Sequence, residues 1–289
     1  MTLLEKRMRG LNRDLLAALS KVLSDAKPKS VHRLRTTIRR IESLVSYANP
    51  QISKKEQRTL EKIADLRKRA GKVRDLDVQS DLLGALGNGS TAKDRKILAN
   101  LMEKKRSQQA RRLVSAIKKV QDAKLFGRLD RIAEQAEVPQ DRKNRPLAPL
   151  EEASAQLMEM AKDFGPGQAL GQTIKPSRLH EIRIALKRIR YLAELAEESP
   201  GQKDFMRELK STQDAIGHWH DWQELTERAE KRFSDRASCA LLREARTLLS
   251  ARHSDAISSL NKLFSLTQAS TKKPPHSTQA LRFAARHAS

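Results

Sequence analysis

The chain has 289 residues, of which 58 are Lys or Arg and 35 are Asp or Glu, so its formal net charge is +23. This length allows two domains or one large one, and the charge favours a polyanionic partner such as nucleic acid, anionic lipid or polyphosphate. The excess is concentrated in residues 1–150, which carry 36 basic and 17 acidic side chains. The single cysteine, Cys239, excludes an intrachain disulfide and is expected to be a buried helical residue rather than a nucleophile.

No apolar run approaches the roughly 20 residues that a membrane-spanning helix requires. Charged residues also interrupt the N-terminal segment too early for a secretory signal. The sequence therefore predicts a soluble, cytoplasmic protein.

Good helix formers dominate the chain, and alternating runs of β-branched and aromatic residues are missing, which predicts an all-α fold. The Pro-bearing segment 138–149 is expected to link a first helical bundle, 1–137, to a second, 150–267, followed by a basic and disordered tail, 268–289. The hydrophobic periodicity predicts helices at about 2–25, 29–48, 52–70, 73–86, 92–121, 123–136, 149–164, 177–198, 201–216, 220–233 and 236–266.

Two short patterns occur twice in the same order. "VHRLRTTIRRIESL" at 31–44 is echoed by "LHEIRIALKRIRYL" at 179–192, an offset of 148 residues. "AGKVRDLDV" at 70–78 is echoed by "IGHWHDWQE" at 216–224, an offset of 146 residues. Two weak matches at nearly the same offset predict an internal duplication.

The first pattern forms an amphipathic helix in both copies. One side of each helix is apolar and the other carries a histidine followed by basic residues without an acid at the centre of the stripe. A solvated charged face is the ordinary explanation of such a stripe, but the repetition and the missing acids favour anion binding. The histidines either donate to a phosphate oxygen or bond a backbone carbonyl, and their repetition on the basic side favours the ligand. The residues concerned are His32, Arg35, Arg39 and Arg40 in the first copy and His180, Arg183, Lys187, Arg188 and, at the edge, Arg190 in the second.

The four segments resemble the CHAD domain, the conserved histidine α-helical domain, and the resemblance runs from about residue 2 to 266. The His helices match its first motif, and "GKVRDLDV" and "GHWHD" match its second, Gly-x-x-[Arg/His]-Asp. The resemblance implies two four-helix bundles related by a pseudo-twofold axis, and a basic surface that binds inorganic polyphosphate without catalysis. It implies ligand contacts from His32, Arg35, Arg39, Arg40, His180, Arg183, Lys187, Arg188 and Arg190, with Arg74 and His220 as further candidates.

The chain departs from the family pattern at three positions. Glu42 stands where a basic residue is frequent, Ser43 where the second copy has Tyr191, and Glu224 where an aliphatic residue is usual. The two aspartates of the second motif, Asp75 and Asp221, are expected either to cap a following helix or to orient a neighbouring Arg or His, rather than to contact the ligand directly.

Several other functions remain as alternatives. Non-specific nucleic-acid binding suits the charge, but aromatic residues are only 3% of the chain, so stacking platforms are scarce. Neither a phosphate-binding loop nor the Glu-x-Glu-x-Lys strand of triphosphate-cleaving tunnel domains is present, which argues against an enzyme. His218 and His220 are two residues apart and would not share a helical face, so a metal site is not expected. Basic amphipathic helices can also lie on anionic lipid, but here their apolar sides are needed for a core.

We therefore expect a non-catalytic polyphosphate binder with no cofactor and no metal, located in the cytoplasm and associated with polyphosphate granules. The affinity is expected to rise between about pH 8 and pH 6, because His32 and His180 gain charge there.

Overall fold

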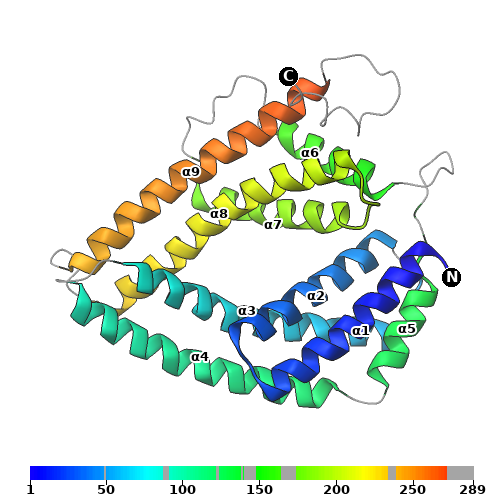
Figure 1. The fold of residues 1–289 in the computed structure, drawn as a ribbon, viewed down its shortest axis with the longest axis horizontal. Helices are drawn as coiled ribbons and strands as arrows, with labels where there is room; N and C mark the ends of the chain where they lie inside the picture. The colour runs from blue at the N-terminus through cyan, green and yellow to red at the C-terminus, as the bar shows by residue number, and fades with distance from the viewer. Residues whose placement is uncertain are drawn as a thin grey trace. The chain divides into compact units, whose positions relative to one another are not determined.

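The computed structural model describes residues 1–48, 50–86, 91–121, 124–137, 139, 148–163, 174–233 and 239–271. All regular secondary structure in these ranges is helical, which confirms the predicted all-α fold for the described part of the chain (Figure 1). The helices are α1 (Leu3–Ser24), α2 (Pro28–Ala48), α3 (Lys54–Ala85), α4 (Ala92–Val120), α5 (Leu125–Glu134), α6 (Pro149–Lys162), α7 (Pro176–Ala193), α8 (Pro200–Arg232) and α9 (Ala240–Thr271).

The helix starts follow from local sequence. Thr2 caps α1 by accepting a hydrogen bond from the backbone N–H of Glu5. At the start of α3, Ser53 and Glu56 form a capping box, in which each side chain accepts a hydrogen bond from the other residue's backbone N–H. A proline stands in the first turn of α6 and α7, where its missing N–H costs no hydrogen bond.

Tertiary contacts divide the chain into two compact units. Unit 1 comprises Met1–Asn144 and Glu227–Arg243, and unit 2 comprises Arg145–Thr226 and Glu244–Ser289. The ranges predicted from the sequence placed Glu227–Arg243 in the second half, whereas the contacts group this segment with unit 1. Arg228 Nε donates to Gln79 Oε1 of α3 at 2.6 Å, and Cys239 Sγ donates to Asp94 Oδ2 of α4 at 3.5 Å.

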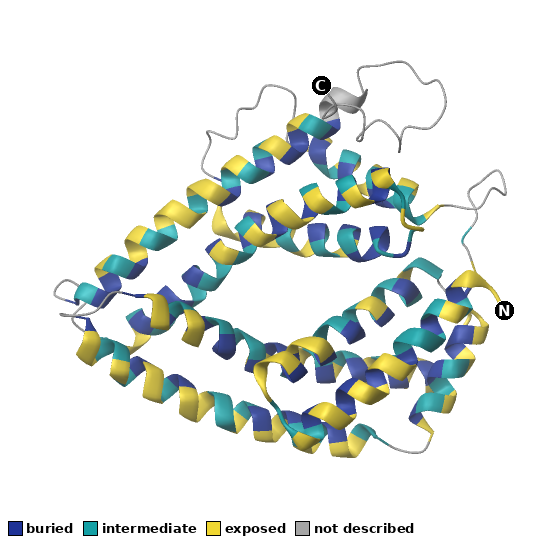
Figure 2. Cartoon of the chain, in the orientation of Figure 1, coloured by how far each residue is buried: buried dark blue, intermediate teal, exposed yellow. Residues whose placement is uncertain are grey.

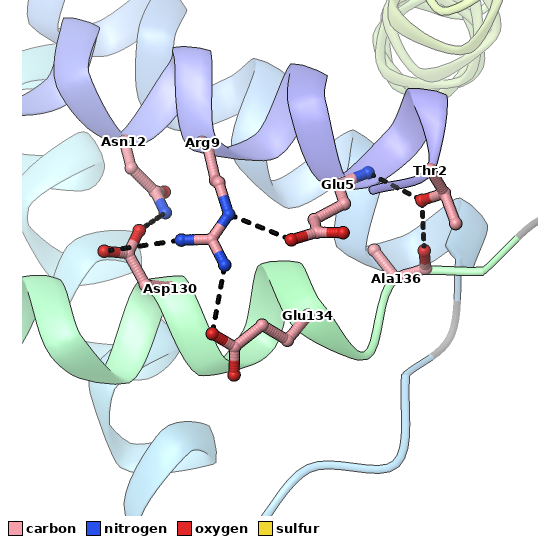
Figure 3. A network of polar contacts seen from close by, with 7 residues as sticks. All are labelled: Thr2, Glu5, Arg9, Asn12, Asp130, Glu134 and Ala136. Atoms are coloured by element: carbon pink, nitrogen blue, oxygen red, sulfur yellow. Dashed lines mark hydrogen bonds and ion pairs between the residues drawn. The ribbon is translucent and has the colours of Figure 1, made fainter.

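In unit 1, α1 packs on α2 and α4, and α3 packs on α2 and α4, so these four helices surround a common core. Each of these helices carries buried residues along one side, coloured dark blue in Figure 2. Those with fully buried side chains include Met8, Leu15, Leu34, Ile38, Leu66 and Leu98. Helix α5 packs against α1 and α3. It is held to α1 by Arg9, whose guanidinium contacts Glu5, Asp130 and Glu134, and by Asn12, which donates to Asp130 (Figure 3).

In unit 2, α6 packs on α7, and buried amide side chains of α8 bond the backbone of α7. Gln213 donates to Leu186 O, and Gln202 donates to Ala193 O at 3.3 Å. Thr212 of α8 donates to Ser259 O of α9 at 3.3 Å. These bonds fix α8 along α7, which matters because both helices carry candidate site residues.

Two helix breaks predicted from the sequence are wrong. Segments 52–70 and 73–86 form the single helix α3, and segments 201–216 and 220–233 form the single helix α8. Gly71 and Gly217, which suggested the breaks, lie inside these helices. A glycine in a helix costs about 1 kcal/mol relative to alanine, but buried positions such as Leu66 and Val73 continue the packed face of α3 across Gly71. Packing along a long helix therefore outweighs the local preference.

Other expectations fall at the edge of the described residues. Most of the predicted linker, 138–149, lies outside them. Helix α9 continues to Thr271 and so enters the segment predicted to be disordered, while residues 272–289 are not described.

The helix starts recur along the chain. Helices α1 to α4 begin at residues 3, 28, 54 and 92, and helices α6 to α9 begin at residues 149, 176, 200 and 240. Corresponding starts are thus 146 or 148 residues apart, the offsets seen in the sequence patterns. A duplication would produce this spacing; the duplication itself, with its two related four-helix bundles, remains a prediction.

Candidate anion-binding sites

In unit 1, α2 is divided as its amphipathic sequence predicts. The apolar side is buried in the core, while His32 and Arg40 are exposed and Arg35 and Arg39 are half-buried. The buried apolar residues are Val31, Leu34, Ile38, Ile41 and Leu44. The basic residues named from the sequence therefore lie together on the side of α2 turned away from the core.

Gly71 of α3 lies beneath this basic side. A Cβ atom added at Gly71 would be 3.7 Å from Nε of Arg35, which is an ordinary contact distance. The Arg35 guanidinium thus rests against the backbone of α3. Arg74 and Asp75 follow on α3, both half-buried, and Asp75 makes an interaction of its own. Since Asp75 lies inside a continuous helix, the expectation that it caps a following helix is wrong.

The departure at Glu42 is compensated within unit 1. Nε of Arg67 on α3 is 2.7 Å from Glu42 Oε2, and both side chains are largely shielded. The negative charge therefore faces a guanidinium of the neighbouring helix. No short-range sequence signal reveals this pair, because its members are 25 residues apart on different helices.

In unit 2, α7 and α8 bring together residues from both sequence motifs. The imidazole of His180 on α7 stacks on that of His220 on α8, with ring centroids 5.4 Å apart and planes inclined by 26°. Asp221 lies close to Arg183 and to its own neighbour His220: its Oδ1 is 4.0 Å from Arg183 Nη2 and 3.6 Å from His220 Nδ1. Glu224 Oε1 is 3.9 Å from His220 Nε2.

These contacts decide between the two roles expected for Asp221. The capping role is wrong, because Asp221 is in the interior of α8. Its position beside Arg183 and His220 fits the orienting role. The sequence named His220 as a candidate, but its stacking on His180 depends on the packing of α7 on α8. Glu224, by contrast, approaches His220 from four residues further along the same helix.

The pKa of His180 is lowered from its ordinary value of 6.5. Burial is the main cause, followed by repulsion from His220, Arg183 and Lys187, while Glu181 acts weakly in the opposite direction. His180 as a residue is exposed, yet one face of its ring is stacked on His220, which limits its solvation. At neutral pH, His180 is therefore uncharged in a cationic environment.

The remaining candidates of α7 are placed differently. Arg188 is exposed and Lys187 half-buried. Arg190 is held within the protein: its Nη1 donates to Glu194 Oε1 at 2.6 Å, and its guanidinium lies 4.5 Å from the ring centroid of Tyr191. The structure thus groups His180, Arg183 and Lys187 with His220, and places Arg190 in a separate contact.

Other expected features are located as follows. Cys239 is buried, and burial raises the pKa of its thiol. His218 is exposed, whereas its neighbour Trp219 is buried. Among the described residues, no three His, Cys, Asp or Glu side chains are arranged to hold a metal ion. Within the same ranges, none of the helices combines the length and apolar character that crossing a membrane requires.

Comparison with known proteins identifies relatives by fold. The crystal structure of the CHAD domain from the plant Ricinus communis is similar with a TM-score of 0.67 and 18% sequence identity, covering 92% of this chain and 91% of that chain. PptA from Streptomyces chartreusis is similar with a TM-score of 0.56 and 16% identity, covering 92% of this chain and 98% of that chain. A comparison with curated protein sequences finds no match. The CHAD domain family model matches residues 7–230, and the chain therefore belongs to the CHAD domain family.

Proposed function

We propose that this protein binds inorganic polyphosphate, without catalysing a reaction, through the basic sides of α2 and α7. The proposal agrees with the polyphosphate binding that the family resemblance implied. It also agrees with the net charge of +23. One site is assigned to each unit, centred on His32, Arg35 and Arg39 in unit 1 and on His180, Arg183 and Lys187 in unit 2.

The observation that carries the proposal is the clustering on α7 and α8 of two stacked imidazoles, His180 and His220, with Arg183 and Lys187. Burial, followed by repulsion from His220, Arg183 and Lys187, lowers the pKa of His180, so its protonation is disfavoured without a ligand. A bound anion reverses this, because a negative charge close to an imidazole favours the protonated form. A phosphate bound here would therefore favour protonated His180 and would add to the compensation that Asp221 gives Arg183.

The chemistry of the two sites suits a phosphate polymer. Arginine offers several N–H donors in a planar fork that matches phosphate oxygens, and lysine adds a compact charge. Polyphosphate carries charge along its whole length and has no bases, so a binder requires donors and positive charge rather than stacking surfaces. Release of counterions should supply much of the affinity, which should therefore fall as salt increases.

A competition experiment tests the proposal. Labelled long-chain polyphosphate competes with duplex DNA of equal total charge at about 150 mM salt, where exposed charges interact only over short distances. The wild type is compared with a site variant in which six residues become Gln: His32, Arg35, Arg39, His180, Arg183 and Lys187. Preference for polyphosphate, lost in a variant that keeps its helical circular dichroism, supports the proposal. Equal competition by DNA together with unchanged binding by the variant contradicts it.

Association with polyphosphate granules is part of the same proposal. It follows if the two sites bind the long chains at a granule surface. A fluorescent fusion of the wild type should concentrate on granules, and the six-residue site variant should not. A wild-type fusion that stays diffuse in cells full of granules argues against this location.

A further inference from the structure

Helix α4 carries a second basic surface that lies outside the two sites described above. Pairs of basic residues recur along it every seven residues, and all six side chains are exposed. We call this surface the α4 stripe. It consists of Lys104, Lys105, Arg111, Arg112, Lys118 and Lys119.

The stripe is regular in three dimensions. Seven residues make nearly two helical turns, so successive pairs follow each other at about 10.5 Å and the six cations extend over about 21 Å. Lys104, Arg111 and Lys118 form one column, and their sequence neighbours form a second column about 100° around the helix. Gln108 and Ser115, both exposed, lie between the columns. Figure 2 shows the exposed side of α4 along its length.

The basic side chains of the α4 stripe are not paired with acidic side chains, whereas many other basic side chains of the described residues are. On other helices, exposed or half-exposed arginines pair with acids three or four residues away, as in Arg9–Glu5, Arg69–Asp65 and Arg252–Asp255. Residues 104–119 contain no acid at all. In the described part of the chain, no ion pair involves a residue of the stripe.

Helix stability explains only part of this pattern. Lys118 and Lys119 lie in the last turn of α4, where positive charge is favourable to the helix dipole. The pairs at 104–105 and 111–112 lie further from that end, where the dipole contributes little. The helix dipole therefore does not account for those four charges.

The stripe and the basic side of α2 are on different sides of unit 1. Helices α2 and α4 each pack on both α1 and α3, so they occupy diagonal corners of the four-helix arrangement. Each buries its apolar side in the shared core, so their solvent sides point away from one another. A short ligand bound at α2 does not reach the stripe.

We propose that the α4 stripe binds a second stretch of long-chain inorganic polyphosphate. The proposal rests on the proposed function and deepens it: a long chain occupies both the His-containing sites and the stripe, whereas a short chain occupies only the former. A second contact made by a tethered chain gains from a high effective concentration, which amplifies weak individual contacts.

The composition of the stripe favours this occupant over the others. Large exposed apolar side chains, which insertion into lipid would use, are found at Met1, Leu3, Leu16 and Ile184 and not on the described α4. Residues 104–119 contain no aromatic side chain on which a nucleobase could stack. The four lysines and two arginines of the stripe place positive charge at regular intervals along α4. This arrangement suits polyphosphate, a linear polymer that carries negative charge along its length and has no bases.

Two variants test the proposal. In the stripe variant all six residues become Gln. The control variant loses four lysines and two arginines, all exposed, elsewhere in unit 1: Lys6, Lys21, Lys54, Lys62, Arg13 and Arg58. Both variants have the same net charge, so a difference between them reports position rather than overall field. Binding of short and long polyphosphate and of duplex DNA is measured by fluorescence anisotropy over a range of salt concentrations.

The stripe variant is expected to bind long chains at least tenfold more weakly than the wild type and short chains within about twofold. For a single-stranded polyanion each lost contact reduces the slope of log K against log salt by about 0.7, so the slope for long chains should become less steep by up to about 4. The control variant should show less than half of either change. In addition, long chains should protect Lys104 and Lys118 of the wild type from acylation.

Four results would overturn the proposal. Equal losses in the stripe and control variants would mean that overall charge acts without a site. Loss of DNA binding with long-chain polyphosphate binding intact would make the stripe a nucleic-acid surface. A wild type that binds neither short nor long polyphosphate would refute the proposed function itself, whereas normal short-chain binding with an unaffected stripe variant refutes the stripe alone.

Discussion

His220 of α8 stacks on His180 of α7 with ring centroids 5.4 Å apart, which joins the second sequence motif to the first within unit 2. The matching position in the first motif pair is Arg74, which is permanently charged at physiological pH. The two proposed sites should therefore differ in their response to pH. In unit 2 the pKa of His180 is lowered from its ordinary value, mainly by burial and then by repulsion from His220.

The first prediction concerns pH and the affinity of unit 2. A bound polyanion favours protonated His180, so affinity rises as pH falls until free His180 is itself protonated. Because the pKa of free His180 is lowered from 6.5, the rise should continue below pH 6.5. Each unit by which binding raises this pKa contributes about tenfold in affinity at low pH. Binding measured from pH 8 to pH 5 should show the rise in the wild type and a flatter profile in His180→Asn.

The same shift predicts a pH dependence of stability without ligand. The unfolded state binds a proton at about pH 6.5, whereas folded His180 resists it. The contribution of this group to stability is complete above pH 6.5 and is lost as pH falls from there toward its lowered pKa. Urea denaturation of the wild type should show this loss, His180→Asn should reduce it, and saturating polyphosphate should offset it. A wild type and a His180→Asn variant with the same pH profile would contradict the shift.

Some of this site follows from the sequence and some does not. The repeat and the helical periodicity predicted which residues share the basic sides of α2 and α7, because both depend on positions within one helix. The stacking of His180 on His220 and the pairing of Glu42 with Arg67 depend on how two helices pack, which short patterns do not encode. The continuity of α3 and α8 was missed for a related reason: local preference at Gly71 and Gly217 suggested breaks, and burial along the whole helix decided otherwise.

The next prediction uses the Glu42–Arg67 pair. Glu42→Gln removes a negative charge that lies 2.7 Å from Nε of Arg67, and so leaves one more uncompensated cation at unit 1. Polyphosphate affinity should increase, and the slope of log K against log salt should steepen by about 0.7 if Arg67 gains a phosphate contact. Titrations at several salt concentrations measure both effects. Arg67→Gln serves as the opposite control and should not bind more tightly than the wild type.

Gly217 offers a test of helix continuity in α8. A Cβ atom added at Gly217 would meet no heavy atom within 4 Å, and alanine stabilises a helix interior by about 0.5–1 kcal/mol relative to glycine. Gly217→Ala should therefore raise the free energy of unfolding by about that amount in urea denaturation, with polyphosphate binding unchanged. A clear loss of stability would mean that Gly217 is needed for a break or a close contact. Gly71→Ala makes the same test in α3, where there is less space: the added Cβ would lie 3.7 Å from Arg35 Nε.

The last prediction concerns the ion pair that ties three parts of unit 1 together. Nε of Arg106 on α4 donates to Asp77 Oδ1 of α3 at 2.7 Å, and its Nη2 donates to Ala26 O, between α1 and α2, at 2.8 Å. The Asp77 side chain is only 3% exposed. Arg106→Leu leaves this carboxylate buried without its partner, which should lower the free energy of unfolding by about 3–5 kcal/mol. The double variant Arg106→Leu/Asp77→Leu should lose less than the single one, because no uncompensated charge remains. A single variant that loses under about 1 kcal/mol would show that water reaches Asp77 and replaces the guanidinium.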